Sequence, residues 1–252
     1  MNRRIRHTAM AAFASLAAAA PAQADDYVQI SLGADYSSGD YGSTPDTTIL
    51  ALPVSVKVKK GNFFVRASLP YLHVDGPAIP GDGGALPGGP STSRGGIGDL
   101  SLAAGYSLPI TETTFFDVTG KAKLPTASES KGLGTGTTDF TAEGELTQVF
   151  GSTSISLRGG RRFNGSSAAF PLNDVWQAGG GIYHTTGPVT LGLDYDWREG
   201  ALAAVPDRSE ITGSIGYKLS DSLRLQGYGY TGLSDGSPNL GGGLQVIYRF
   251  GQ

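Results

Sequence analysis

The most constraining feature of this chain is an alternation of apolar and polar residues that recurs from residue 27 to the C-terminus. In its last stretch, residues 240–250, the even positions are Gly or apolar and end in two aromatic residues, whereas Gln245 and Arg249 stand at odd positions. A period of two indicates a β-strand with one apolar face, and no helical register collects those even residues on one side. Such a strand near the C-terminus is typical of the closing strand of an outer-membrane barrel, although Gly251 and Gln252 follow it here. A sheet in lipid leaves no edge unpaired, so this strand is predicted to pair with the first strand of the mature chain.

The same alternation predicts eleven further strands. They cover residues 27–36, 48–59, 63–71, 100–106, 116–124, 140–150, 155–158, 176–182, 189–198, 211–218 and 223–230. The connections after the even-numbered strands are short, and those after the odd-numbered strands are mostly longer. Residues 75–95 and 126–138 read as long loops, because they are rich in small and turn-forming residues and show no period. The Arg161-Arg162 pair breaks the alternation and predicts a bulge or a strand end. An even strand count places both termini on the periplasmic side.

Charge placement separates a membrane barrel from a soluble sheet protein. Apart from Arg161, the apolar rows contain no Asp, Glu, Lys or Arg. A charge facing lipid costs about 2–4 kcal/mol near the bilayer midplane, so these rows fit a lipid-facing surface. A soluble β-sandwich also alternates, but its outer face is charged and its inner face holds the core. The apolar rows here are diluted by Ala and Gly. The predicted fold class is all-β: a transmembrane antiparallel up-and-down β-barrel of twelve strands.

Residues 1–24 have the three parts of a cleaved signal peptide. A basic start with Arg3, Arg4 and Arg6 precedes an apolar run at residues 10–20, and Ala22-Gln-Ala24 is a small-x-small cleavage site. The run is too short to span a bilayer as a helix. The alternative, a buried N-terminal helix of the mature protein, does not explain all three parts. We therefore expect an exported protein whose residues 25–252 form one barrel domain in the bacterial outer membrane.

Composition supports export and excludes several function classes. The chain has no Cys, which excludes disulfides and thiolate metal sites. The leader takes three of the 19 Lys and Arg residues and none of the 22 Asp and Glu residues, so the mature chain is acidic and has no basic surplus to hold nucleic acid. With 39 Gly and 39% hydrophobic residues, the chain is poor in apolar residues for a soluble core of this length. No metal or cofactor is predicted; the expected partners are outer-membrane lipids and a small-molecule solute, and the sequence predicts no oligomeric state.

Charges of both signs stand on the polar rows and are the candidate lumen-lining residues. The basic candidates are Lys57, Lys59, Arg66, Lys121, Lys123, Arg158, Lys218, Arg224 and Arg249. The acidic candidates are Asp35, Asp99, Asp117, Glu143, Glu145, Asp194, Asp196 and Glu210. They form either a ladder of ion pairs that fills and stiffens the lumen or the facing walls of a pore that orient a solute. Barrels of about eight strands are filled by side chains, and barrels of about sixteen strands enclose a channel. Twelve strands lie between these sizes, so a filled lumen and a pore both stay possible interpretations, and a narrow pore is preferred.

An enzyme is the rival class, because some twelve-stranded outer-membrane barrels are phospholipases with a Ser and a His near the extracellular rim. His73 is predicted at about that height on an outward row, but its neighbours on that face are Tyr71 and Asp75 rather than a serine nucleophile. His184 is predicted at a periplasmic turn. A rim or turn imidazole is the preferred interpretation of both, and no catalytic residue is assigned.

Four short motifs resemble outer-membrane proteins named for the meta-cleavage pathway of phenol degradation. In order they are Ser68-Leu-Pro-Tyr71, Gly96-Ile-Gly-Asp99-Leu, Leu124-Pro-Thr126 and Gly134-Thr-Gly-Thr-Thr-Asp139. The resemblance covers most of the mature chain and implies a transport channel for aromatic or other small hydrophobic solutes. It carries over no catalytic residues, and it marks Gly96, Gly98 and Asp99 as residues that shape a strand crossing at the rim.

The sequence thus predicts a passive, porin-like channel for small solutes. Two alternatives stay open. One is a structural or adhesive barrel with a plugged lumen, and the other is a lipid hydrolase at the rim.

Overall fold

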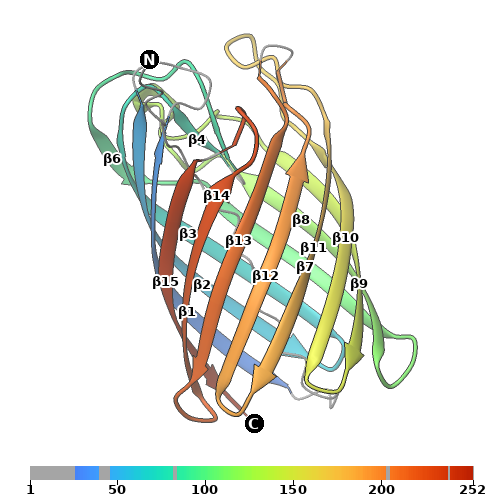
Figure 1. Cartoon of the computed structure of the whole chain (residues 1–252). Coiled ribbons are helices and arrows are strands. Elements are labelled where there is room, and N and C mark those ends of the chain that lie inside the picture. Colours follow the sequence, from blue (N-terminus) through green and yellow to red (C-terminus); the bar gives the residue numbers. More distant parts are fainter. Residues whose placement is uncertain (1–25, 40–45, 82–83, 203–204, 238, 252) are drawn as a thin grey trace, which may run out of the picture.

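A computed structural model of the chain describes residues 26–39, 46–81, 84–202, 205–237 and 239–251. Twelve long antiparallel strands, inclined to the long axis, close into a single barrel (Figure 1). In chain order they are β1 (Tyr27–Gly39), β2 (Thr47–Lys60), β3 (Phe63–Asp75), β7 (Leu100–Pro109), β8 (Thr114–Leu124), β9 (Asp139–Phe150), β10 (Thr153–Phe163), β11 (Val175–Thr186), β12 (Val189–Arg198), β13 (Arg208–Lys218), β14 (Leu223–Gly232) and β15 (Leu240–Phe250). The predicted signal peptide, residues 1–24, lies outside the described residues.

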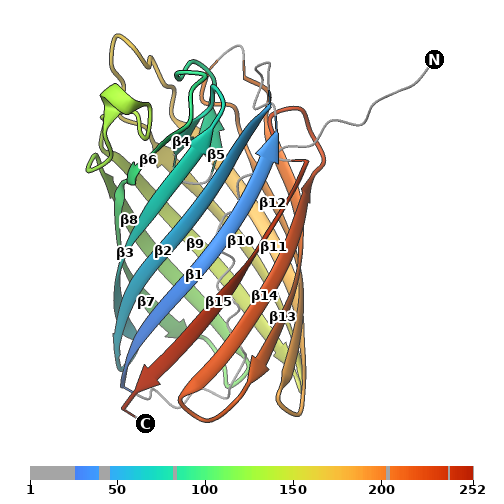
Figure 2. The same cartoon turned by 90° about the vertical axis from the view of Figure 1, so that its left-hand side faces the viewer.

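The last strand closes the barrel against the first, as the sequence predicts. β15 pairs with β1 over its whole length, from Val28 opposite Phe250 to Ser38 opposite Leu240. Each other long strand pairs with the next long strand in the chain. β3 pairs directly with β7, although short strands lie between them in the sequence. The described chain begins and ends at the same end of the barrel, where the Gly61 amide donates to Asp26 Oδ1 at 2.7 Å. Figure 2 shows β1 and β15 side by side, with the C-terminus at the lower end.

Short turns mark one end of the barrel, and long loops mark the other. The turns at Gly61-Asn62, Gly151-Ser152 and Gly187-Pro188 have two residues each, and each begins with a glycine at positive φ. Only glycine adopts that conformation without steric cost, so these positions fix tight hairpins. Residues 110–113 and 219–222 complete this short-turn end. All connections at the opposite, long-loop end are longer.

The two faces of the wall differ as the sequence predicts for lipid outside and polar groups inside. Leu52, Leu102 and Leu193 are among the exposed large hydrophobic residues of the outer rows. Among the described residues, the buried set holds twenty polar or charged residues against twelve apolar ones, which is the reverse of a soluble core. The outer rows therefore do not face each other across a dry interior, and the sandwich alternative is excluded.

The predicted loop at residues 75–95 contains regular structure that its sequence does not reveal. A small hairpin pairs β4 (Ile79–Gly81) with β5 (Gly84–Leu86), and β6 (Arg94–Ile97) pairs with the end of β3 before the chain enters β7. Backbone pairing requires no apolar alternation, so Gly- and Pro-rich segments form it without a sequence period. In the second long loop, a single 3₁₀ turn, η1 (Glu129–Lys131), precedes β9. No helix among the described residues is long and apolar enough to cross a membrane.

Two local predictions are wrong. Arg161 produces no bulge or strand end, because β10 runs unbroken to Phe163 with Arg161 opposite Ala142. The side chain of Arg161 instead lies over the Trp176 ring at 5.0 Å and pairs with Asp174 at 3.6 Å near the long-loop end. Such a rim position lets a charge on an outer row reach polar partners. His184 lies within β11 and not in the adjoining turn, and its Nδ1 is 2.9 Å from Thr153 Oγ1.

Candidate functional site

The inner face of the barrel, which we call the lumen wall, carries the charged residues that the sequence places on its polar rows. Of the seventeen candidates, all except Lys218 are buried or half-buried. Lys218 is exposed at the end of β13 and pairs with Asp221 in the following turn at 2.7 Å. That hydrogen bond lowers the pKa of the Asp221 carboxyl. The remaining candidates separate into groups with distinct positions and partners.

The first group is basic and lies on neighbouring strands of one wall. This basic group consists of Lys57, Lys59, Arg66, Arg224 and Arg249. Its members come from β2, β3, β14 and β15, which adjoin one another through β1. Among the described residues, no carboxylate forms an ion pair with any of the five. The basic group is therefore a local concentration of positive charge without direct ion pairs to the described carboxylates, and the charge of Asp117 on β8 acts on Lys57 from a longer distance.

Aromatic rings contact the basic group at the short-turn end. The Lys57 ammonium lies 4.4 Å from the centroid of the Phe64 ring, and the Arg249 guanidinium lies 4.6 Å from that of Tyr27. Cations are attracted to the negative face of an aromatic ring, so these contacts supply part of the stabilisation that carboxylates supply elsewhere. The Nε of Arg249 also donates to Gln29 Oε1 at 2.9 Å, which fixes the plane of its guanidinium.

The second group, on the strands β8 to β13, is dominated by carboxylates. This acidic group consists of Asp117, Glu143, Glu145, Asp194, Asp196 and Glu210. Several of its members are compensated by neighbours on the same wall. Arg158 bridges Asp194 at 3.4 Å and Asp196 at 2.7 Å, and Lys121 pairs with Glu143 at 3.4 Å. Arg208 pairs with Glu210, and Tyr183 donates to Asp194.

The order of the strands places the two groups on opposite walls. In the closed ring, β10 lies six strands from β1 in both directions, and the basic group surrounds β1 whereas the acidic group surrounds β10. The basic group lies near the short turns, whereas Glu143, Asp196 and Glu210 lie nearer the long loops, so the separation of charge runs obliquely across the lumen. Charges of opposite sign on facing walls orient a dipolar or charged solute. The structure thus places the two charge groups on different walls and also contains cross-strand ion pairs, so the pore and the filled-lumen interpretations both stay predictions.

Asp35 stands apart from the acidic group, on β1 beside the basic wall. Tyr228 donates to its Oδ2 at 2.8 Å, and Tyr230 lies 3.3 Å from its Oδ1. Hydroxyl donors therefore satisfy this buried carboxylate, and among the described residues no cation forms an ion pair with it. The alternation of the sequence places both tyrosines on the polar row with Arg224 and Gln226, but it gives no signal that they bond to a carboxylate two strands away.

At the long-loop end, a buried charge network joins the barrel to the loop of residues 125–138. Lys123 pairs with Asp139 at 2.9 Å and lies 3.5 Å from Asp99, and Arg162 pairs with the same Asp139 carboxylate. Asp99 Oδ1 also accepts the amide hydrogen of Ala127 at 3.0 Å. Asp99 and Lys123 therefore hold the loop to the rim, and the structure does not place them with the two facing groups.

Arg94 is a second residue that organises this end, and sequence reasoning missed it. Its guanidinium donates to the carbonyl oxygens of Gly76 at 2.7 Å, Pro90 at 2.8 Å and Gly132 at 3.2 Å, and also to that of Ala78. One side chain thereby ties both long loops together. A lone arginine in a Gly- and Pro-rich segment gives no sequence signal for this role, because its partners are backbone carbonyls.

A small apolar cluster fixes the same loops to the inner wall of β2 and β3. Its buried members are Ile49, Ala51, Leu72, Val74, Ala78, Ala127 and Leu133. Ile49 and Val74 come from the strands and Leu133 comes from the loop of residues 125–138. Together with the bonds of Arg94, this cluster makes the two loops a packed cap over part of the lumen, which we name the loop cap (residues 76–81, 84–95 and 125–138).

The only histidine contact to a serine hydroxyl among the described residues is at the rim. Ser93 Oγ lies 3.3 Å from His73 Nε2, and both side chains are exposed. The serine comes from the loop before β6, so neighbours on the His73 strand could not reveal it. Nucleophilic catalysis also requires a group that orients the imidazole and donors for an oxyanion. No described carboxylate bonds to His73, and no group of described His, Asp and Glu residues is arranged to hold a metal ion.

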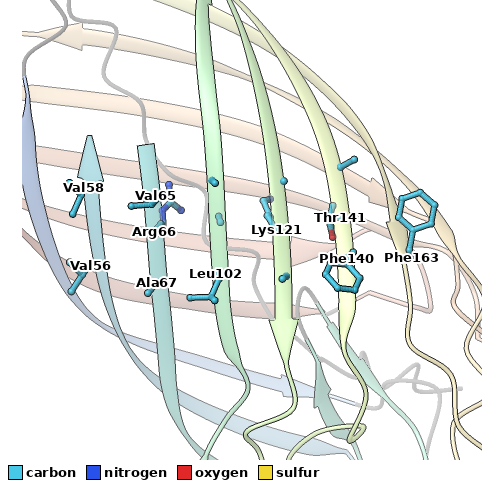
Figure 3. Close-up of a pocket in the computed structure, with 15 residues that line it drawn as sticks. Val56, Val58, Val65, Arg66, Ala67, Leu102, Lys121, Phe140, Thr141 and Phe163 are labelled. Atoms are coloured by element: carbon cyan, nitrogen blue, oxygen red, sulfur yellow. The ribbon is translucent and has the colours of Figure 1, made fainter. Parts of the chain in front are cut away.

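The outer face carries a shallow apolar groove over β2, β3 and β7 to β10 (Figure 3). Valine and phenylalanine side chains such as Val56 and Phe140 border it, whereas small residues such as Ala67 and Ala122 form its floor. The groove fits the lipid-facing surface and lies outside the lumen.

Comparisons with known proteins agree with this architecture. The model of a family described as "Putative MetA-pathway of phenol degradation" matches residues 46–250. An outer membrane channel from Pseudomonas putida F1 is 13% identical with a TM-score of 0.68, and the match covers 93% of this chain and 98% of that one. A KdgM porin in complex with disordered oligogalacturonate is 9% identical (TM-score 0.58, 87% and 99% covered), and a NanC porin is 7% identical (TM-score 0.57, 88% and 99% covered). These likenesses show the fold of a closed twelve-stranded barrel. None of the curated proteins matches the chain.

Proposed function

We propose that this chain, which belongs to the family described as "Putative MetA-pathway of phenol degradation", is an outer-membrane channel through which small solutes diffuse passively. One observation carries the proposal. The closed barrel exposes apolar rows outside, and inside it sets a basic group, without direct ion pairs among the described residues, on the wall across from an acidic group. A barrel that served only as a scaffold gains nothing from unpaired charge inside, whereas a solute pathway uses it.

The outer membrane is the proposed location, with the short turns facing the periplasm. Short periplasmic turns and long extracellular loops are the usual asymmetry of such barrels. The signal peptide at residues 1–24 supplies the export that this location requires. N-terminal sequencing of the protein from isolated outer membranes tests both points, with Asp25 as the expected first residue.

The proposed solutes are small and include aromatic or other hydrophobic molecules. The family description names phenol degradation, and it supports an aromatic solute. The lumen wall offers ring faces such as those of Tyr27 and Phe64 beside polar groups. Swelling of liposomes that contain the protein, in iso-osmotic solutions of solutes of increasing size, measures which solutes enter.

Conductance in planar bilayers is the direct test of a channel. We expect discrete current steps from the purified mature protein. Absence of both unitary currents and liposome swelling would contradict the proposal. The control is the same protein heated until the barrel unfolds, which must give no steps.

A barrel with a plugged lumen is the second candidate, and the loop cap is the observation that favours it. The cap is held by the bonds of Arg94 and by an apolar cluster in which Ile49 and Val74 have no exposed surface. A cap that never opens gives a protein without conductance. Weakening the cap through Arg94 then creates currents that the unaltered protein lacks, whereas a channel conducts before the change.

A lipid hydrolase at the rim is the weaker alternative. The contact between Ser93 and His73 is its single supporting observation. Because the imidazole lacks a carboxylate partner among the described residues, we expect no hydrolysis of short-chain nitrophenyl esters or phospholipids above background. Activity that disappears in Ser93→Ala and in His73→Ala would restore the enzyme.

A further inference from the structure

Four residues of the lumen wall lie side by side at one level of the sheet, and three of them are cations. Lys57 on β2 is directly opposite Arg66 on β3 and, on its other side, directly opposite Gln29 on β1. Gln29 in turn is directly opposite Arg249 on β15. Arg249, Gln29, Lys57 and Arg66 therefore form one continuous row across four adjacent strands, which we name the cation row.

The next row of inward-facing residues, closer to the short turns, has a lysine between two aromatic residues. Lys59 is directly opposite Tyr27 on β1 and Phe64 on β3. The rings of these two residues also contact the cation row, since Phe64 lies under Lys57 and Tyr27 under Arg249. The cation row is thus backed by ring faces on the side of the short turns, and its half-buried side chains border the lumen.

Like charges directly opposite each other in a sheet repel, and such a pair is destabilising unless a counter-charge lies between. Lys57 and Arg66 form such a pair, and no described carboxylate is within ion-pair distance of either. Half-buried cations also lose part of their hydration. The electrostatic attraction between such a cation and an anion in the lumen is therefore stronger than at an exposed site. The row is therefore arranged to attract a negatively charged group.

The contrast with the other inner cations makes this imbalance local. Arg158 has two carboxylate partners, Lys121 has Glu143, and Lys123 and Arg162 share Asp139. Outside the basic group, the barrel therefore neutralises these inner cations with its own acids. Within the basic group, the cation row places three cations without ion pairs among the described residues at one level of the sheet.

The chemistry of the row also specifies the kind of anion. Two guanidinium groups offer planar, paired N–H donors, the geometry that matches a carboxylate. The bond from Arg249 Nε to Gln29 holds one of these groups in a fixed orientation. Tyr27 and Phe64 supply ring faces within reach of an apolar or aromatic body. A small inorganic anion would use the charges but not the rings.

We propose that the cation row, with Tyr27 and Phe64, is a binding site inside the lumen for a small organic carboxylate that carries an apolar or aromatic body. The inference rests on the proposed function in that it names the solute class that the channel favours. At the short-turn end the bound carboxylate lies near the periplasmic exit, so the site draws anionic solutes through the lumen.

Binding can be measured without any transport. Equilibrium dialysis of the full-length mature protein in detergent against labelled benzoate gives the affinity, with benzyl alcohol as the neutral analogue and acetate as the analogue without a ring. We expect benzoate to bind more tightly than either. Arg66→Gln is expected to weaken benzoate binding about tenfold, the scale of one charge-assisted hydrogen bond to a carboxylate. Lys218→Gln, which removes an exposed cation outside the row, is the matched control and leaves binding unchanged.

Ion selectivity of the same variants separates this inference from the proposed function. In planar bilayers under a salt gradient, the reversal potential of the unaltered protein is expected to favour anions, and Arg66→Gln and Lys57→Gln are expected to shift it towards cations. Heat-modifiable migration on gels confirms that each variant is folded. If Arg66→Gln conducts with the same ion selectivity as the unaltered protein and also binds benzoate equally well, the binding site at the cation row is refuted and the channel is not. Tight benzoate binding without any current would uphold the site and overturn the channel.

Discussion

Tyr228 on β14 donates a hydrogen bond to Asp35 on β1 at 2.8 Å, across the intervening strand β15. The bond passes over Gly241 and Gly243, whose missing side chains leave room for the rings of Tyr230 and Tyr228. The run of glycines in the closing strand therefore has a packing role. It lets two tyrosines lie flat against the wall and reach a carboxylate on the strand beyond, next to the seam where β15 meets β1.

Gly243→Ala is expected to destabilise this seam. A Cβ at this position would overlap Tyr228 Oη and lie 2.5 Å from the carbonyl oxygen of Ala34, so the wall or the ring must shift. Overpacking of this kind costs about 1–3 kcal/mol. Urea unfolding in lipid vesicles, followed by tryptophan fluorescence, measures the loss. Gly213→Ala is the matched control, because a Cβ there meets no atom within 4 Å; equal effects of the two changes would refute the packing role.

Asp139→Asn is expected to be strongly destabilising. Asp139 is 2% exposed, and its carboxylate forms ion pairs with both Lys123 and Arg162. The substitution removes this shared negative charge from two cations at the rim. Loss of one partner from a buried ion pair typically costs about 3–5 kcal/mol. Asp221→Asn provides the control, since the exposed pair of Asp221 with Lys218 is expected to add nothing measurable. The free energies of unfolding of the two variants decide the point, and a small effect at Asp139 would be inconsistent with the network.

Arg94→Met is expected to loosen the loop cap without unfolding the barrel. Methionine fills similar space but donates no hydrogen bond to Gly76, Pro90 or Gly132. Hydrogen bonds to a charged group contribute about 1.5–3 kcal/mol each, so the cap should open at least about tenfold more often. Faster cleavage of the loops by proteinase K and larger or noisier currents are the readouts. Lys131→Met, an exposed change in the other loop of the loop cap, should leave both unchanged.

Leu193→Arg tests which face of the wall meets lipid. Leu193 is 52% exposed near the middle of β12, whereas Leu240 is exposed at the first residue of β15, near the rim. A charge at the bilayer midplane costs about 2–4 kcal/mol and one near the interface about 0–1 kcal/mol. We therefore expect Leu193→Arg to reduce the free energy of unfolding in vesicles far more than Leu240→Arg. Equal costs at the two positions would mean that β12 does not cross a bilayer.

The loops show where sequence-based prediction stops. Residues 75–95 read as structureless, yet they contain a hairpin and β6, because glycine and proline form backbone hydrogen bonds without an apolar pattern. Ser93 and His73 meet only because β6 pairs with β3. Arg161 was expected to interrupt β10, but its charge is accommodated at the rim by Asp174 and the Trp176 ring, which no local rule about alternation includes.

Alternation and charge placement are enough to predict the closed antiparallel barrel, its twelve strands and its short turns, and the structure confirms these predictions. A period of two fixes the face of every side chain, and the cost of charge in lipid fixes which face is outside. Which inner charges neutralise each other depends on the folded barrel and cannot be predicted from the alternation. Lys57 and Arg66 are opposed because of the β2–β3 register, and Arg249 joins them because β15 closes on β1. The sequence held nearly balanced charges, but separation of charge across a lumen depends on register and closure, which are properties of the whole ring.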